Sequence, residues 1–225
     1  VKAAARPHRI DNLFQQFDTD GSGAVTYDEF KEMVAEFKQL ANNLDNFKRS
    51  MEIQAKNEVS KVNTVLESLA NINVNLSGAK ASNSMLDGRD QAIDDLNQIA
   101  QVHVKINQSN TAEITLGDVA NGPKLLADND ARTLQVTAGF GKLHFSVTSG
   151  TNSSQTNQVT GGAIEGYAKA YTAADGVIKK INELAFLICR MVNQINNVLR
   201  LILNIYLLKL LNQYYFYNPF SILDV

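Results

Sequence analysis

Apolar residues recur every three or four positions over two long stretches, the spacing expected of helices that pack along one face. The first stretch runs from Leu40 to Leu76 and contains no glycine or proline. The second follows Gly161-Gly162 and continues to Ile202, with steps of three and four in turn, as in a heptad. An elongated antiparallel rod made of both helices would bury both apolar seams. A break at Asn42-Asn43 is the competing interpretation, because paired asparagines are weak helix formers.

Between the two helices the apolar pattern shortens to alternate positions, which is typical of strands. Residues 77–84 are expected to form a loop, and Ser84 to cap a short helix with Asp87 in the place of the capping-box glutamate. Four or five short antiparallel strands are predicted within 102–149, followed by a polar connector over 149–160. Asn121-Gly122-Pro123 and Gly139-Phe140-Gly141 are predicted turns. The fold class expected is mainly α with a small inserted β domain (α+β).

Residues 18–29 place oxygen donors at the spacing of a calcium-binding loop. An EF-hand loop supplies ligands from positions 1, 3, 5, 7, 9 and 12 and turns sharply at position 6, which here is Gly23. The ligand positions hold Asp18, Asp20, Ser22, the carbonyl of Ala24, Thr26 and Glu29. Apolar helical faces flank the loop, so residues 10–37 resemble an EF-hand, and the resemblance implies bound Ca²⁺. A solvated acidic turn between two helices is the alternative.

The sequence thus predicts an EF-hand helix-loop-helix that leads into the rod. The predicted segments are an EF-hand at 1–38, helical rod and short helix at 39–101, β region at 102–149, return helix at 150–197 and apolar tail at 198–225. The tail has no polar face, but charged and amide residues interrupt it before about 18 apolar residues accumulate. It is expected to pack on another part of the protein or on another copy rather than to enter a membrane. An aberrant tail that follows a natural end near residue 197 is the further alternative.

Composition and charge exclude several classes of protein. A net charge of −2 without a basic stripe gives no footprint for nucleic acid. The single cysteine, Cys189, cannot form an intramolecular disulfide and is expected to be buried among apolar neighbours. Residues 1–9 lack the apolar core of a cleaved signal. The three histidines are dispersed and no phosphate-binding loop occurs, so no enzyme is predicted.

Three segments carry a likeness to a known family. They are the rod with Val62-Asn63-Thr64 and Ile72-Asn73-Val74-Asn75-Leu76, the short helix with Leu86-Asp87-Gly88-Arg89-Asp90, and the opening of the return helix, Gly161-Gly162-Ala163-Ile164-Glu165-Gly166-Tyr167. In their order and in the β region that they enclose, residues 39–197 resemble the middle of the flagellar hook-associated protein 1 family, the hook–filament junction proteins.

The resemblance implies a non-enzymatic structural subunit of the bacterial flagellum, extracellular and exported without a cleaved signal. Its implied partners are flagellar hook and junction proteins, or further copies joined through the helical rod. An EF-hand and the apolar tail stand where the family has its terminal assembly segments, which implies a truncated member. The alternative is a cytoplasmic, calcium-responsive regulatory or interaction protein that pairs two loops through Val25.

Overall fold

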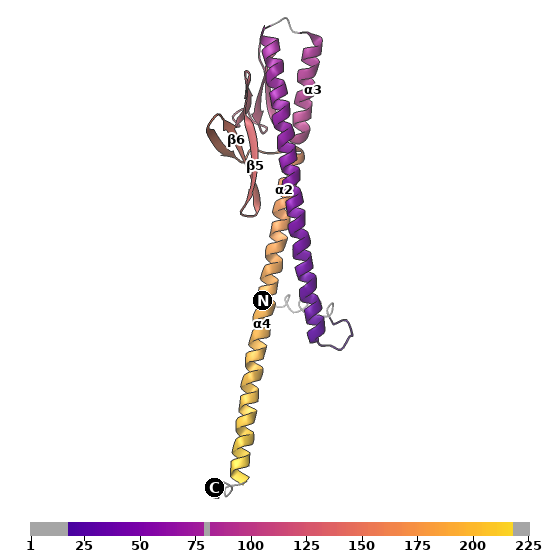
Figure 1. The fold of residues 1–225 in the computed structure, drawn as a ribbon, viewed down its shortest axis with the longest axis vertical. Helices are drawn as coiled ribbons and strands as arrows, with labels where there is room; N and C mark the ends of the chain where they lie inside the picture. Colours follow the sequence, from indigo (N-terminus) through magenta and orange to yellow (C-terminus); the bar gives the residue numbers. More distant parts are fainter. Residues whose placement is uncertain (1–17, 79–81, 218–225) are drawn as a thin grey trace, which may run out of the picture. The chain divides into compact units, whose positions relative to one another are not determined.

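The computed structural model describes residues 18–78 and 82–217, with side chains described as far as residue 209. The helices are α2 (Tyr27–Gly78), α3 (Asn83–Ile99) and α4 (Gly162–Tyr217) (Figure 1). The strands between α3 and α4 are β1 (Val102–Ile106), β2 (Ala112–Leu116), β3 (Lys124–Ala127), β4 (Asp130–Ala131), β5 (Thr133–Gly139), β6 (Lys142–Ser149) and β7 (Asn152–Thr156). Residues 38–178 form one compact unit, and the described residues 18–37 and 179–217 belong to a second.

Helix α2 is continuous through Asn42-Asn43, so the predicted uninterrupted helix is confirmed and the competing break is wrong. The side-chain amide of Gln39, one turn before Asn43, donates a hydrogen bond to Asn43 Oδ1 at 3.0 Å. After the two asparagines, Arg49 forms an ion pair with Asp45 at 3.0 Å. Such contacts four residues apart support a helix through weak formers. The buried stripe of the helix comprises Ala55, Val59, Val62, Leu66, Leu69, Asn73 and Leu76.

Helix α3 begins earlier than the sequence indicated. Ser82, rather than Ser84, is the N-cap residue, and its hydroxyl accepts a hydrogen bond from the backbone of Met85 at 3.3 Å. The predicted Ser84 cap is therefore wrong, because the hydroxyl two residues upstream satisfies a free amide of the first turn. Inside the unit of residues 38–178, α3 runs beside α2 (Figure 1). The two helices are close at Gly88, where an added β-carbon would lie 3.9 Å from Cδ1 of Ile72.

The strands form two antiparallel sheets, with orders β1-β2-β3-β4 and β5-β6-β7. The predicted strands appear as β1, β2, β5 and β6, and the two predicted turns are confirmed. The structure adds β3 and β4 inside the expected region and β7 beyond it. The predicted polar connector is therefore wrong over Asn152–Thr156. This segment pairs with β6 at the edge of its sheet, where mostly exposed polar residues satisfy the ladder.

Every helix and both sheets contribute fully buried side chains to the core of the 38–178 unit. These are Leu66 and Leu69 from α2, Leu96 from α3, Ile114 and Leu134 from the sheets, and Ile164 from α4. Helix α4 runs antiparallel to α2 within this unit. Its residue Asp175 pairs with Lys48, whereas Ala163, the second residue of the helix, lies near Glu58 and Lys61. The predicted antiparallel pairing is confirmed over this part of the chain.

The apolar seam of α4 is buried only over its first half. Ile164, Tyr171, Ala174 and Ile181 are buried, but the later seam residues Val192, Ile195, Leu199 and Ile202 are exposed. The expectation that the partner helix covers the whole seam is therefore wrong. Cys189 is exposed as well, and its predicted burial fails because its neighbours on this stretch are themselves exposed. Among the described residues, no helix is long and apolar enough to cross a membrane.

Candidate functional site

The loop of residues 18–26 folds its backbone around two aspartates. Asp18 accepts hydrogen bonds from the backbone amides of Ser22 at 2.8 Å and Gly23 at 2.7 Å, and Asp20 accepts from Ser22 at 2.9 Å. The bond from the Ser22 amide lowers the pKa of Asp20. Gly21 and Gly23 adopt φ angles of 69° and 81°, a conformation that glycine reaches without steric cost.

Glu29 closes the loop from the first turn of α2. Its Oε2 accepts from the amide and hydroxyl of Thr26, both at 2.8 Å, and its own amide donates to the Thr26 hydroxyl at 3.3 Å. This reciprocal pair is a capping box. Its Oε1 accepts from the amide and hydroxyl of Thr19 at 2.7 and 2.8 Å. The Thr26 amide first, and then the Thr19 hydroxyl, lower the pKa of Glu29 to about 2.

Three acidic side chains of the loop converge on one region. Carboxylate oxygens of Asp18, Asp20 and Glu29 all lie within 4.8 Å of one another. Two ligands on opposite sides of a calcium ion are separated by about 5 Å, because each bond is about 2.4 Å long. The other predicted ligands join the same network: the Ser22 hydroxyl donates to the Ala24 carbonyl at 3.0 Å, and Thr26 contacts Glu29. The predicted helix before the loop lies outside the described residues.

Two asparagines of α2 bind the backbone of the sheets. The Asn73 amide is fully buried, and its Oδ1 accepts from Ala112 N while its Nδ2 donates to Ala112 O, both at 2.9 Å. The same Nδ2 donates to the Asp128 carbonyl at 2.5 Å. Ala112 and Asp128 are the next pair along the register set by Ile114 and Leu126, so the side chain occupies the space where β2 and β3 separate.

Asn63 repeats the contact ten residues earlier on the helix. Its side chain exchanges two hydrogen bonds with Leu134, at 2.8 and 2.9 Å, along the edge of β5 that β6 does not cover. An unpaired strand edge is a liability that covering elements remove. Each asparagine thus takes the place of a neighbouring strand. Both motifs are visible in the sequence but this role is not, although Asn73 falls in register with the buried Leu66, Leu69 and Leu76.

The second motif anchors the β1–β2 turn. Arg89 on α3 is buried and donates to the carbonyl of Asn110 at 2.7 Å, while Asp90 accepts from its Nε and Nη2 at 2.8 and 2.6 Å. Asn110 has a φ angle of 64°, in the left-handed region. The carboxylate orients the guanidinium, whose planar set of donors then holds a strained turn against α3.

The third motif is shaped by contact with the end of α3. Gly162 has a φ angle of 63°, and a β-carbon there would lie 2.4 Å from the carbonyl carbon and oxygen of Ile99. A β-carbon added at Gly161 would likewise lie 2.9 Å from the β-carbon of Gln101. Only glycine permits this approach, which sets the start of α4 directly against the turn from α3 into β1.

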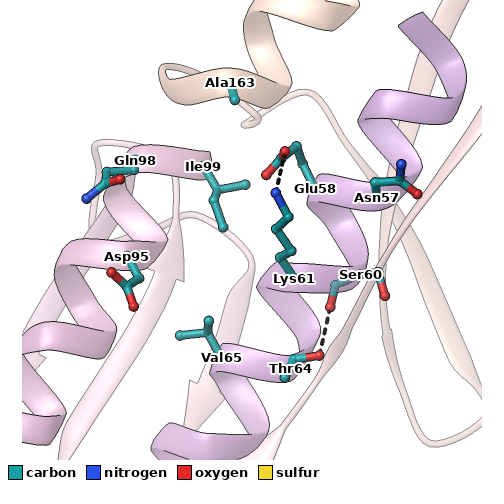
Figure 2. A pocket seen from close by; sticks show the side chains of 10 residues that line it. All are labelled: Asn57, Glu58, Ser60, Lys61, Thr64, Val65, Asp95, Gln98, Ile99 and Ala163. Carbon is teal, nitrogen blue, oxygen red and sulfur yellow. Dashed lines mark hydrogen bonds and ion pairs between the residues drawn. The ribbon is translucent and has the colours of Figure 1, made fainter. Parts of the chain in front are cut away.

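A groove of about 680 Å³ lies between α2 and α3, with Ala163 of α4 at one end. Figure 2 shows the side chains of Val65 and Ile99 turned toward the space between the two helices. Glu58 and Lys61 pair at 2.8 Å along the α2 side, and Asp95 belongs to the α3 side. The groove is polar at its rim and apolar at its base, and it holds no constellation of catalytic groups.

Comparison with known proteins gives one family. The family model described as "Flagellar hook-associated protein FlgK helical domain" matches residues 10–200, a wider range than the predicted 39–197. This range includes the loop of residues 18–29 as well as all three motifs.

Curated relatives and a solved structure agree with that match. Over 108 residues the chain is 32% identical to flagellar hook-associated protein 1 of Salmonella typhimurium and 33% identical to that of Escherichia coli. These matches cover 45% of this chain and 19% of each relative, so the chain spans about a fifth of their length. The flagellar hook junction protein FlgK from Burkholderia pseudomallei has a similar fold, with a TM-score of 0.55 and 20% identity over 72% of this chain and 32% of that one.

Proposed function

The chain belongs to the family of the flagellar hook-associated protein FlgK helical domain, and from that premise we propose that it is a structural, non-enzymatic subunit of the hook–filament junction. The observation that carries this proposal is the family match across residues 10–200. The hook and junction proteins of the flagellum would be its partners, and its place would be outside the cell.

The roles of the motif residues support an architectural function. Asn63, Asn73, Arg89 and Gly162 all bind or approach backbone groups of the same compact unit. None of them faces an open site in which a substrate could react. They fix two small sheets against the helices, which is what a rigid building block requires.

Fractionation of flagella tests the junction proposal. An antibody raised against residues 38–178 should detect the chain in purified hook–filament preparations from the source cells, and gold labelling should place it where hook and filament meet. Absence of the chain from flagella of cells that express it would refute a junction role.

We further propose that residues 18–29 bind Ca²⁺ through Asp18, Asp20, Ser22, Ala24, Thr26 and Glu29. The support is the spacing of the oxygen donors and the convergence of three carboxylates within 4.8 Å. Bound calcium would supply positive charge that offsets the mutual repulsion of these carboxylates. Because hydrogen bonds already organise the loop, the ion would act as a local brace rather than as a condition for folding.

Glu29→Gln separates the calcium site from the capping box. Glutamine keeps one oxygen for the capping box but lacks the charge that a calcium ligand at position 12 provides. It also loses the Thr19 bonds to Oε1, with and without calcium, so the quantity compared is the calcium-induced gain within each variant. At a calcium concentration of about 100 times Kd, the wild-type chain should gain about 2.7 kcal/mol of stability. Glu29→Gln should lose most of this gain, whereas Asp28→Asn, at an exposed position that is no ligand, should keep it.

Melting curves in calcium and in chelator measure this difference. An equal calcium-induced rise in Tm for wild type and Glu29→Gln would refute the site, as would the absence of a rise in the wild-type chain. Light scattering under the same conditions addresses the regulatory alternative. A calcium-dependent doubling of mass that Val25→Asp abolishes would favour a regulator, and an unchanged mass favours the structural subunit.

A further inference from the structure

The hairpin of β5 and β6 presents an aromatic side chain in a backbone conformation that does not suit it. Phe140 is 98% exposed and has a φ angle of 49°, and Gly141 follows with a φ of 77°. These two residues form the turn between the paired residues Gly139 and Lys142. Two-residue turns with positive φ at both positions favour asparagine and glycine, and a bulky residue there is an outlier. Within 18–78 and 82–217 nothing compensates, since the exposed ring makes almost no contact with these residues.

The tip itself is held firmly. A β-carbon on Gly141 would lie 2.1 Å from Asp175 of α4, so the turn rests directly on this carboxylate. Asp175 pairs with Lys48 of α2, whose ammonium lies 4.9 Å from the centre of the Tyr171 ring. On the hairpin, Nε2 of His144 donates a hydrogen bond to the Gly139 carbonyl at 3.0 Å. The strained, exposed phenylalanine is therefore displayed on a rigid support, where such outliers commonly serve contact with another molecule.

We propose that Phe140 is an anchor that enters the groove between α2 and α3 of a second copy of this chain. The base of the groove offers Val65 and Ile99 to an aromatic ring, and its volume of about 680 Å³ exceeds that of a phenylalanine side chain. Charge complementarity fixes the orientation. Lys142 is exposed beside Phe140. Asp95, whose Oδ1 accepts a hydrogen bond from the Gln91 side chain at 2.9 Å, takes part in none of the ion pairs found among the described residues.

The two surfaces cannot meet within one copy. The groove ends at Ala163, whereas the hairpin tip rests on Asp175, twelve residues further along the same helix. At 1.5 Å per residue this separates them by about 18 Å along α4. An anchor and a groove at different places on one rigid unit make a head-to-tail contact, which repeats from copy to copy instead of closing into a symmetric pair. The contact is a property of the chain itself and stands apart from the proposed flagellar role.

Disulfide trapping between two differently labelled chains tests the contact. Both chains carry Cys189→Ser, one also carries Ala138→Cys on the hairpin beside an intact Phe140, and the other carries Gln98→Cys at the exposed rim of the groove. Mixed under mild oxidation, they should form a cross-linked heterodimer, while neither chain alone should form a cross-linked dimer. Moving the hairpin cysteine from Ala138 to Val119, an exposed apolar loop position, should give no heterodimer. Melting curves before oxidation establish that every variant is folded.

A charge swap distinguishes a specific contact from chance collision. Lys142→Asp on the anchor chain should lower the cross-linked yield roughly tenfold, the factor expected for about 1.4 kcal/mol. Asp95→Lys on the groove chain should then restore it. Absence of the heterodimer would overturn the proposal. So would equal cross-linking of the Ala138→Cys chain with itself, which would mean a tip-to-tip contact, or a yield that the charge swap leaves unchanged.

Discussion

Replacing Asn73 by alanine should destabilise the unit of residues 38–178 far more than the same change at Asn63. Asn73 is fully buried, and its removal leaves the amide and carbonyl of Ala112, also fully buried, without a partner. Each buried unsatisfied group costs about 1–3 kcal/mol, so the expected loss is about 2–6 kcal/mol. Leu134 is fully buried as well, but its partner Asn63 is only half-buried, so water can enter the space that the side chain leaves and the loss should be a net of about 1–2 kcal/mol.

Urea unfolding followed by far-UV circular dichroism measures both losses on the full chain. Hydrogen exchange at single amides adds a local reading, since the Ala112 amide should lose protection in Asn73→Ala while the Leu134 amide keeps it. The opposite pattern is expected for Asn63→Ala. If Asn73→Ala cost no more than Asn63→Ala, or if Ala112 stayed protected, the buried amide would not hold the sheet in the way described.

Three further changes probe the other contacts. Gly162→Ala should destabilise by at least about 2 kcal/mol because its β-carbon meets the Ile99 backbone, while Gly166→Ala, with open space around it, should stabilise by up to about 1 kcal/mol; equal Tm values would contradict this. Arg89→Lys should cost about 1–2 kcal/mol in urea unfolding, because lysine cannot hold Asn110 and Asp90 together, and a neutral result would refute the clamp. The Asn107 side chain first, and then Lys105 and Lys124, lower the pKa of Glu113, so its stabilisation is present above the usual carboxyl pKa and is lost as pH falls through the lowered value. Glu113→Gln should therefore flatten the fall of stability with acid below about pH 4.5, as measured by urea midpoints, and parallel curves would contradict it.

Apolar periodicity predicted the helices because their buried stripes are long and regular. The continuous α2, the strands β1, β2, β5 and β6 and the turn at Phe140 all follow from local pattern. Periodicity failed at β7, where a polar edge strand has no apolar signature, and along α4 beyond Ile181. A heptad pattern indicates that a helix has an apolar face that another helix can bury. Which part of that face is buried depends on the length and position of the partner helix, which the local sequence does not contain.

The contacts made by polar motif residues are harder to predict from sequence. Ion-ligand spacing can be read from a loop of twelve positions, because all its members are close in the chain. Asn63 and Leu134 are separated by 71 residues, and Asn73 and Ala112 by 39. A polar residue in a buried stripe signals that some partner exists, yet only the fold determines whether that partner is a backbone, a side chain or a ligand.

The distribution of polar contacts argues for a building block whose sheets are set by α2. Each asparagine pairs with a backbone amide and carbonyl, so its contact depends on the register of a strand and not on the side chains that the strand carries. The sheet surfaces can therefore vary while their attachment to the helix stays fixed. The hairpin tip is arranged in a similar way. The contact between Gly141 and Asp175 fixes the backbone of the tip, while the Phe140 side chain stays exposed for the proposed contact with another copy. The choice of binding partner would then depend on a few exposed side chains, while the backbone that carries them keeps the same structure.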